Sequence, residues 1–387
     1  MSYSRDLSFI YYNPTKIIFG EGSIKEIGIE VEALGGTRAV VVTDRGVVEA
    51  GLAGEVEEAL GRKYVGTFDG AVQDSGFHIV NEGAKFAREA GADTIVSVGG
   101  GSSIDTAKGI SILLKEGGQM QDYSGFQLLS RPQTPHIAVP TTAGTGSEAT
   151  YAAVVKDWEN NEKILFCDNH IIPRVAILDP LLTAGLPPPL TASTGIDALT
   201  HAIEALHALQ AEPIADAMAL QAIRLITAYL PRCVANGDDL FARGQQQIAA
   251  LMAGVAFSNA QLGLVHAMAH SLGALFNVPH GLANSLLLPH VMLYNLESCA
   301  ERYLLVAEAM GLATAGLDEE GAARLAVNAV QELTRKIGLP QRLREAGVPE
   351  EGLAEAAELS LSDGSIIYNP RPVFEADEVL ALFREAW

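Results

Sequence analysis

Residues 94–114 read TIVSVGGGSSIDTAKGISILL, and this stretch sets the class of the first half of the chain. A short, mostly apolar run, Thr94–Val98, ends at three consecutive glycines, and a segment with helical spacing follows. Similar apolar runs recur at residues 39–43, 136–139 and 175–178. Near-continuous apolar strands that alternate with helical segments indicate a parallel sheet covered on both faces. We therefore predict an α/β, Rossmann-like dinucleotide-binding domain here.

The second half of the chain has a different pattern. Residues 192–387 are rich in Ala and Leu at 3.6-type spacing and contain few strand-like runs, which indicates helices. Three prolines at 187–189 separate the two patterns, and such a run continues neither a helix nor a strand. We therefore predict an α/β domain over residues 1–186 and an all-α domain over residues 187–387.

The composition excludes several classes of protein. The 26 Lys and Arg residues against 47 Asp and Glu residues give a net charge of −21, which disfavours nucleic-acid and anionic-membrane partners. Three cysteines without metal-ligand spacing fit a reducing compartment. The N-terminus carries charges where a signal peptide is apolar, and no run approaches the roughly 20 apolar residues that span a bilayer. We expect a cytoplasmic protein.

The glycine turn in the opening stretch can receive a pyrophosphate. Gly99, Gly100 and Gly101 let the backbone approach a ligand closely. Ser102 adds a hydroxyl, and the following helix would present free N–H groups to phosphate oxygens. Asp105, near the start of that helix, is typical of a cap or first-turn residue. The turn matches neither GxGxxG nor the Walker pattern, so a tight strand–helix junction is the alternative.

Two further segments follow strands in the same half. Asp44 either accepts hydrogen bonds from an adenosine ribose, which would favour NAD over NADP, or only forms a turn before Arg45. Residues 140–148, PTTAGTGSE, carry four hydroxyls and two glycines after another strand. They form either a polar ligand groove at the carboxyl edge of the sheet or a long loop that Ser147 caps. Two such loops on one sheet favour ligand binding.

Six of the nine histidines lie in one stretch of 90 residues, 201–290, inside the predicted helical half. Asp197 and His201 are four residues apart, as are His266 and His270, so each pair shares one face of a helix. His280 follows in a Pro–His–Gly turn. One carboxylate with several neutral imidazoles suits a divalent metal such as Fe²⁺, Zn²⁺ or Ni²⁺. The glutamate of the HExxH pattern is missing, which disfavours a peptidase.

With these motifs the chain resembles the iron-containing (group III) alcohol dehydrogenase family over nearly its whole length. The motifs that carry the resemblance are Gly99–Ser102 with Asp105 and Lys108, residues 140–148, TGIDALTHAIE at 194–204, GLVHAMAH at 263–270, PHGLAN at 279–284 and NPRP at 369–372. The resemblance implies NAD as the cofactor and Fe²⁺ as the metal, with Zn²⁺ or another divalent ion as the alternative. It also implies a homodimer or larger homo-oligomer.

The resemblance assigns roles position by position. The metal ligands would be Asp197, His201, His266 and His280. His270 would be a catalytic histidine beside the nicotinamide that does not bind the metal and relays a proton, and Phe257 would line the substrate pocket. The residues that we assign to the cofactor are Asp44, Gly99, Gly100, Gly101, Ser102, Asp105, Thr141, Thr142, Lys163 and Leu182.

One segment departs from the family pattern. Many members have a Pro-Asn-Pro turn that contacts adenine, whereas this chain reads Gln73-Asp74-Ser75-Gly76. An adenine contact at Asp74 is therefore not carried over.

The implied activity is the NAD-linked interconversion of short-chain primary alcohols or diols with aldehydes. The metal would bind the alcohol oxygen and lower its pKa, and hydride would pass to the nicotinamide. One alternative is a metal- and NAD-using cyclase or lyase that resembles dehydroquinate synthase. It would need several cations for a charged substrate, and residues 194–284 hold only Arg224, Arg232 and Arg243. A non-catalytic metal- or nucleotide-binding protein is disfavoured because both candidate sites are complete.

Overall fold

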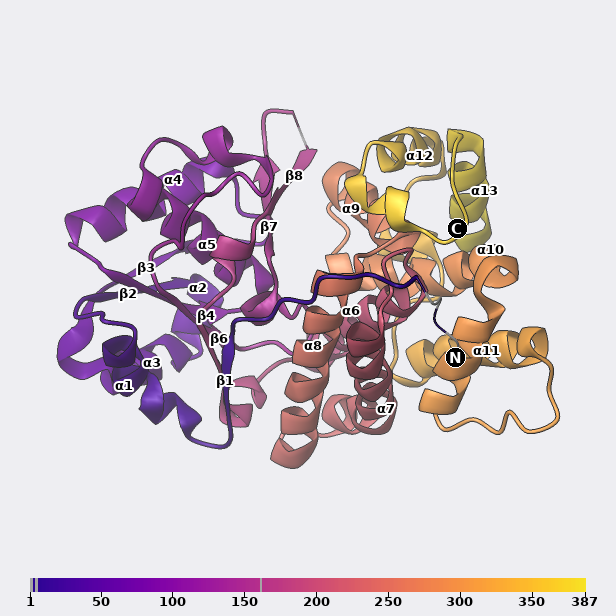
Figure 1. Ribbon diagram of the computed structural model, residues 1–387, viewed down its shortest axis with the longest axis horizontal. Coiled ribbons are helices and arrows are strands. Elements are labelled where there is room, and N and C mark those ends of the chain that lie inside the picture. Colours follow the sequence, from indigo (N-terminus) through magenta and orange to yellow (C-terminus); the bar gives the residue numbers. More distant parts are fainter. Residues whose placement is uncertain (1–2, 4–5, 161) are drawn as a thin grey trace. The chain divides into compact units, whose positions relative to one another are not determined.

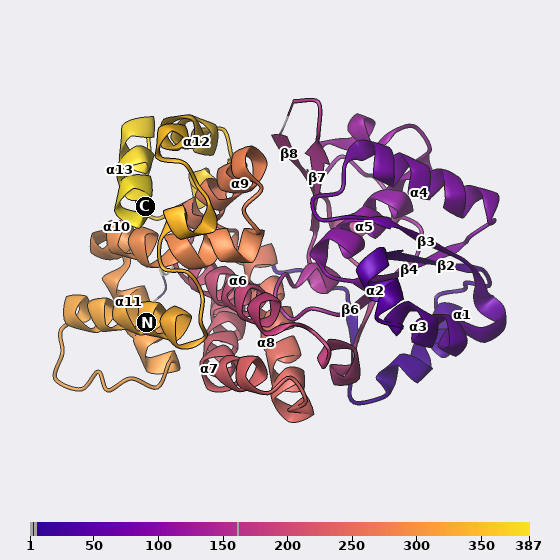
Figure 2. The same cartoon turned by 180° about the vertical axis from the view of Figure 1, so that it is seen from behind.

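The computed structural model describes residue 3, residues 6–160 and residues 162–387. The chain divides into two compact units, which are described separately (Figures 1 and 2). One unit is Asn13–Leu186, and the other is Pro187–Trp387 together with the N-terminal residues up to Tyr12.

The first unit is built on a parallel sheet of six strands in the order β1-β9-β6-β4-β2-β3. The strands are β1 (Lys16–Phe19), β2 (Ala39–Asp44), β3 (Tyr64–Ala71), β4 (Thr94–Gly99), β6 (His136–Pro140) and β9 (Val175–Leu178). The apolar runs predicted as strands form β2, β4, β6 and β9. A smaller sheet contains β5 (Gly125–Phe126), β7 (Ala152–Asp157) and β8 (Glu162–Cys167), and β7 and β8 are antiparallel.

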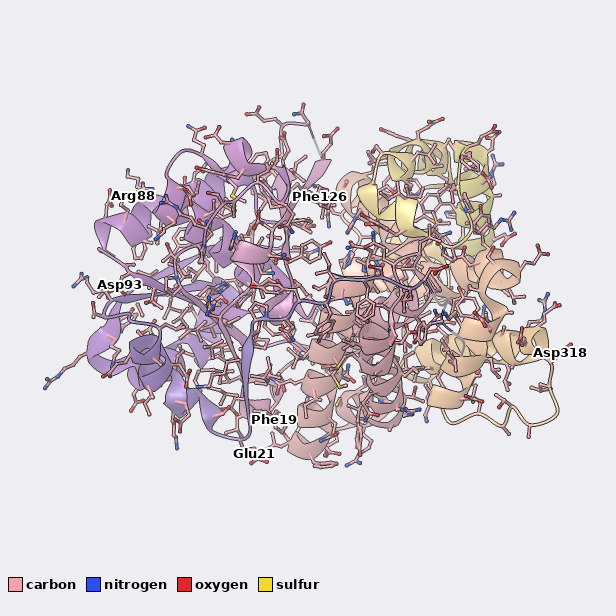
Figure 3. All side chains as sticks on the ribbon, in the orientation of Figure 1. Phe19, Glu21, Arg88, Asp93, Phe126 and Asp318 are labelled. Atoms are coloured by element: carbon pink, nitrogen blue, oxygen red, sulfur yellow. The ribbon has the colours of Figure 1, made fainter. Side chains whose placement is uncertain are left out.

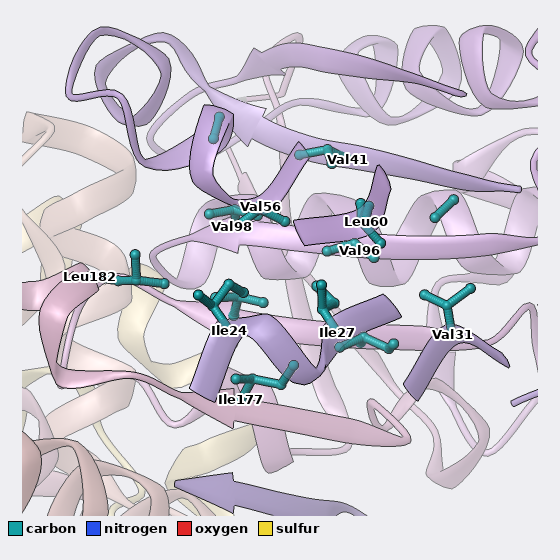
Figure 4. Close-up of a cluster of buried hydrophobic side chains, with 14 of the residues drawn as sticks. Ile24, Ile27, Val31, Val41, Val56, Leu60, Val96, Val98, Ile177 and Leu182 are labelled. Atoms are coloured by element: carbon teal, nitrogen blue, oxygen red, sulfur yellow. The ribbon is translucent and has the colours of Figure 1, made fainter. Parts of the chain in front are cut away.

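Helices cover both faces of the large sheet. They are α1 (Ile27–Ala33), α2 (Arg45–Glu49), α3 (Leu52–Leu60), α4 (Phe77–Glu89) and α5 (Gly101–Glu116). Alternate side chains of a strand point to opposite faces. Val41 and Val96 join a buried cluster that α1 and α3 complete (Figure 4), while Val40 and Ile95 join a second cluster that α4 and α5 complete. The predicted α/β class with a parallel sheet is confirmed.

Among its described residues, the second unit contains helices joined by loops and no strand. Its helices are α6 (Pro188–His207), α7 (Pro213–Ala235), α8 (Leu240–Ala260), α9 (Leu264–Phe276), α10 (His280–Ala309), α11 (Glu319–Lys336), α12 (Leu353–Leu361) and α13 (Ala376–Ala386). Small residues let these helices approach closely. A Cβ at Gly195 of α6, for example, would lie 2.2 Å from Leu230 Cδ1 of α7. Within α10 the backbone leaves the helical region at Cys299 (φ −150°, ψ 34°), so this helix is kinked.

In both units, aspartate carboxylates accept hydrogen bonds from backbone N–H groups at the ends of helices or beside strands. Asp318 begins α11 by accepting a hydrogen bond from Gly321 N at 2.8 Å (Figure 3). Asp93 accepts from the backbone N–H groups of Thr37 and Arg38 at 3.0 and 2.9 Å, which joins the loops that precede β2 and β4. Such bonds satisfy backbone donors that no helix or strand uses.

Tyr3 and residues 6–12, the described residues of the N-terminal segment, depart from the predicted division, which placed them in the α/β domain. They cluster with the helical unit because their polar groups bind its helices. The Tyr3 hydroxyl donates to Asp216 Oδ2 of α7 at 2.5 Å, and Tyr12 N donates to Asn259 Oδ1 of α8 at 2.8 Å.

Among the described residues, no single helix has both the length and the apolar composition of a membrane span. Helices α8 and α9 meet that criterion only as a pair, and the pair is bent by 107°.

Candidate active site

Four side chains of the helical unit bring their donor atoms together. Asp197 and His201 lie one turn apart on α6, His266 lies on α9, and His280 is the first residue of α10. One donor atom from each lies within 4.8 Å of the others. Asp197 Oδ1 is 3.8 Å from His201 Nε2 and 3.5 Å from His280 Nε2. A carboxylate with three imidazoles is a donor set that fits a divalent transition metal.

Glycine at position 281 lets the start of α10 reach α6. A Cβ at Gly281 would lie 2.3 Å from the carbonyl oxygen of Ser193 and 3.2 Å from Asp197 Cβ. Any larger residue would have to displace backbone there, so this contact places His280 beside Asp197.

The carboxylate of Glu204 contacts Nδ1 of His266, the ring nitrogen that does not face the donor cluster. Glu204 lies on α6, is fully buried, contacts His266 Nδ1 and accepts a hydrogen bond from Val265 N at 2.8 Å. Burial lowers the pKa of His266 to about 3, so its ring is neutral. When Nδ1–H donates its hydrogen bond to Glu204, Nε2 carries no proton, and its lone pair faces the donor cluster. Sequence analysis missed Glu204, although its position three residues after His201 was a usable signal.

Asn284 contacts three of the four donors. Its Nδ2 lies 2.6 Å from Asp197 Oδ1, 3.2 Å from His280 Nε2 and 3.3 Å from His266 Nε2. Its Oδ1 is buried and has no hydrogen-bond partner among the residues that the structure describes. The amide nitrogen carries two protons, whereas three acceptors converge on it. Acceptors that converge in this way suit a cation, so the residues present fit the metal that the donor set implies.

His270 stands beside the four-residue cluster and is not a member of it. It lies one turn after His266 on α9, and its ring stacks on His280 with centroids 5.3 Å apart. Its Nδ1 is 2.6 Å from Asp363 Oδ2. Burial raises the pKa of the Asp363 carboxyl, but the charge and hydrogen bond of His270 and the N–H of Ser365 outweigh burial and lower it. No local sequence pattern indicates Asp363, which is 93 residues from His270.

Phe257 supplies an apolar surface next to the cluster. Its ring centroid lies 4.5 Å from that of His201, with the planes inclined by 32°.

In the α/β unit, the glycine turn lies directly against residues 140–148. A Cβ at Gly100 would lie 3.2 Å from Thr142 Cγ2, and a Cβ at Gly101 would lie 2.8 Å from Thr145 Cγ2. Thr141 N donates to the carbonyl of Gly99 at 3.0 Å. The structure therefore brings Gly99–Ser102 together with Thr141 and Thr142. Side chains on these glycines would press against Ser103, Thr142 and Thr145, so glycine keeps the two loops close together at the N-terminus of α5, whose backbone N–H groups suit a phosphate group.

Asp44 has partners within the protein. It caps α2 by accepting from Val47 N at 3.0 Å, and its other carboxylate oxygen accepts from Ser103 Oγ at 3.0 Å. The turn-forming role of Asp44 is therefore present in the structure. A carboxylate has further lone pairs, so these bonds leave acceptor capacity for a ribose.

Asp105 ties α5 to the 140–148 segment. It accepts from Ser147 Oγ at 2.5 Å and lies 3.7 Å from the ammonium of Lys108, which is fully buried. Lys108 donates to Ser147 Oγ at 2.8 Å, and burial lowers its pKa to about 8. Burial raises the pKa of the neighbouring Glu148 to about 7. Asp105 thus positions the two loops of the predicted cofactor site relative to each other.

Two other residues assigned to the cofactor lie elsewhere in the α/β unit. Leu182 is buried in the cluster that contains Ile177 and Val98 (Figure 4). Lys163, on β8, pairs with Asp74 at 2.8 Å. Asp74 N in turn donates to Ser102 Oγ at 3.3 Å, so Lys163 is linked to the glycine turn through Asp74.

Comparison with known proteins gives family matches along nearly the whole chain. Residues 14–180 match the family model for iron-containing alcohol dehydrogenase, and residues 191–387 match the model for the C-terminal part of the Fe-containing alcohol dehydrogenase family. The chain is 43% identical to the 1,3-propanediol dehydrogenase of Citrobacter freundii, with 98% of this chain and 99% of the relative covered. It is 40% identical to the NAD-dependent methanol dehydrogenase of Bacillus methanolicus, with 93% and 95% covered.

Solved structures agree with this assignment. A crystal structure of 1,3-propanediol oxidoreductase superposes with a TM-score of 0.95 at 42% identity and covers 98% of this chain and 100% of that one. With both family models matched and relatives of this similarity aligned along nearly their full length, the chain belongs to the iron-containing alcohol dehydrogenase family.

Proposed function

We propose that this protein is a metal-dependent, NAD(H)-linked oxidoreductase that interconverts short-chain primary alcohols or diols with aldehydes. The observation that carries the proposal is the convergence of Asp197, His201, His266 and His280, whose donor atoms lie within 4.8 Å of one another. The names of the relatives, which are dehydrogenases of small alcohols and diols, support the substrate class. None of these names supports the cyclase or lyase alternative.

The four donors would hold the metal, which we propose to be Fe²⁺, with Zn²⁺ or another divalent ion as the alternative. A divalent ion there supplies Lewis acidity, which favours loss of the alcohol proton and polarises an aldehyde carbonyl. Glu204 keeps His266 in the tautomer that offers Nε2 to a metal. Phe257 places an apolar surface beside His201, where the carbon chain of a small alcohol would lie.

His270 is the proposed proton relay. Its Nδ1 is tied to Asp363, so Nε2 is the ring nitrogen left to accept or return a proton. In the α/β unit, the cradle of Gly99–Ser102 with Thr141 and Thr142 would receive the pyrophosphate of NAD, and Asp44 would accept from the adenosine ribose. NAD supplies the hydride acceptor.

The activity is tested with protein loaded with Fe²⁺ or Zn²⁺, NAD⁺ and a panel of short primary alcohols and diols, followed by the absorbance of NADH. Metal analysis of the same preparation relates the rate to the ion bound. Absence of NADH formation with every alcohol, together with absence of NADH consumption with every aldehyde, would reject the proposal.

A cytoplasmic location and a homodimer or larger homo-oligomer are also proposals, with alcohol or aldehyde as the small-molecule partner. Cell fractionation and light scattering of the purified protein test them.

Replacing Asp44 with glycine is expected to let NADPH compete with NADH. A carboxylate near the ribose repels a 2′-phosphate, and its removal should shift the preference by about tenfold, the scale of one unit charge at short range. Asp44→Asn is the matched variant, because asparagine also caps helices and removes only the charge. Dissociation constants for both cofactors measure the effect. An unchanged preference in both variants would leave Asp44 with its capping role alone.

Replacing Asp363 with asparagine is expected to lower kcat while metal retention and KM stay close to those of the wild type. His270 Nδ1 and Ser365 N bind different oxygens of the Asp363 carboxylate, and asparagine replaces one of these oxygens with an NH₂ group, so the ring can lose its fixed tautomer. We expect roughly a tenfold loss, part of the 10²–10⁴-fold that a general acid–base group contributes. The pH profile of kcat should change shape. A rise in KM or a loss of metal, without the change in the pH profile, would indicate a merely structural role.

A further inference from the structure

Lys163, which the family resemblance assigns to the cofactor, forms an ion pair with Asp74, a residue with no assigned role that is bonded to the glycine turn. Lys163 Nζ lies 2.8 Å from Asp74 Oδ1, and the two side chains are only 6% and 22% exposed. A buried ammonium group is costly unless it is paired. Asp74 provides that pairing from the segment between β3 and α4.

The backbone of Asp74 is fixed from two sides. Its N–H donates to Ser102 Oγ at 3.3 Å, and its carbonyl accepts from Trp158 Nε1 at 3.2 Å. Its φ of 53° lies in the left-handed region, which asparagine and aspartate tolerate better than most residues. The backbone of Asp74 is therefore held next to the first turn of α5, and its carboxylate is held by Lys163.

The β7–β8 hairpin brings Lys163 to the same place. Lys156 of β7 is the register partner of Lys163, and Lys156 N donates to the carbonyl of Ser75 at 2.9 Å. The turn that contains Asp74 is thus bonded to β7, which packs on α5 (Figure 1). The strand register places the ammonium group opposite the carboxylate.

This arrangement governs the charge near the phosphate cradle. The N-terminus of α5 attracts anions, and a free ammonium group nearby would strengthen that attraction. Here the charge of Lys163 is balanced by Asp74, while Asp44 accepts a hydrogen bond from Ser103, the residue after Ser102. The carboxylate of Asp44 thus binds Ser103, the backbone N–H of Asp74 binds Ser102, and the charge of Lys163 is paired with the carboxylate of Asp74.

We propose that the Asp74–Lys163 pair sets the affinity of this chain for the dinucleotide by withholding the charge of Lys163 from the pyrophosphate. This inference rests on the proposed function, in which the glycine turn binds NAD. Removal of the Asp74 charge releases the ammonium group to the cofactor phosphates and tightens binding. Removal of Lys163 leaves the carboxylate of Asp74 without its cation, on a residue whose N–H is bonded to Ser102, and weakens binding.

The test is a double-variant cycle in which the charges of Asp74 and Lys163 are removed singly and together. The dissociation constants of NADH and ADP-ribose are measured for each full-length, metal-loaded protein. Asp74→Asn keeps the size of the side chain and the left-handed backbone. It is expected to tighten both ligands about fivefold, as for one partly screened charge, and to make binding fall more steeply with salt. Lys163→Met is expected to weaken both ligands severalfold. The double variant, which lacks both charges, should return close to the wild type.

Glu162→Gln is the matched control, since Glu162 is exposed on β8 next to Lys163 and its change alters the net charge by the same amount. It should leave both dissociation constants unchanged. Equal or weaker binding by Asp74→Asn, or tightening that persists in the double variant, would overturn the inference. If Asp74→Asn does not fold, Lys163→Met decides, because unchanged binding there overturns the inference as well. Wild-type protein that binds neither ligand would instead overturn the proposed NAD site.

Discussion

Replacing His280 with alanine is expected to remove bound metal and alcohol turnover together. His280 supplies one of four donors, and Asp197 Oδ1 is 3.5 Å from its Nε2. Its side chain is 28% exposed, so the substitution leaves a small, solvated gap and the fold should persist. With three donors left, retention of a divalent ion through purification should fail, and turnover should drop to background. Metal content and rate, measured on one preparation, check this expectation.

His290 on the same helix provides the control. His290→Ala is the same substitution within α10, but His290 is not a member of the donor cluster. It should keep both metal and activity. NADH binding should survive in both variants, because the glycine turn belongs to the α/β unit. A His280→Ala protein that is loaded with metal and active would reject the ligand assignment. The same result is expected for His266→Ala, but that variant also leaves the buried carboxylate of Glu204 without its bond to the imidazole.

Replacing Glu204 with glutamine is expected to weaken metal binding by about 10–100-fold, the usual effect of removing a residue that orients a histidine ligand. The carboxylate serves two donors, His266 Nδ1 and Val265 N. Glutamine has one oxygen, so one donor must face its NH₂ group. If that donor is His266, the ring must move its proton to Nε2 and loses the lone pair that faces the cluster.

Titration in a metal buffer measures this effect, and a double-variant cycle identifies its origin. In a His266→Ala background, Glu204→Gln should cause no further loss of metal affinity, because the imidazole that it orients is absent. Additive losses would show that Glu204 acts by some route other than His266.

The sheet was predictable where both faces of a strand are covered. Every residue of β4 and the first five of β2 are buried, so their sequences are nearly continuous apolar runs. By contrast, β3 reads YVGTFDGA and remains mostly half-buried, and β8 begins at the exposed Glu162 and continues through half-buried residues. These strands exist because of their neighbours in the sheet, which sequence periodicity does not report.

Site residues could be predicted where their partners are close in the sequence, and could not where the partners are distant. Asp197 with His201, and His266 with His270, share helix faces at a spacing of four, which can be read directly from the sequence. The bond of His270 to Asp363 spans 93 residues, and the pair of Lys163 with Asp74 depends on strand register, so neither has a local signal. Glu204 lies between these cases, since its helix position was visible but its partner was not.

The amide of Asn284 has a consequence for how the protein handles ions. It bridges Asp197, His266 and His280 and thereby keeps three donors gathered. Entry of an ion then exchanges hydrogen bonds for coordination bonds and does not require the helices to assemble around it. We therefore expect the metal-free enzyme to remain folded and to be reloaded with different divalent ions, so that the ion found after purification reflects the supply in the cell or buffer.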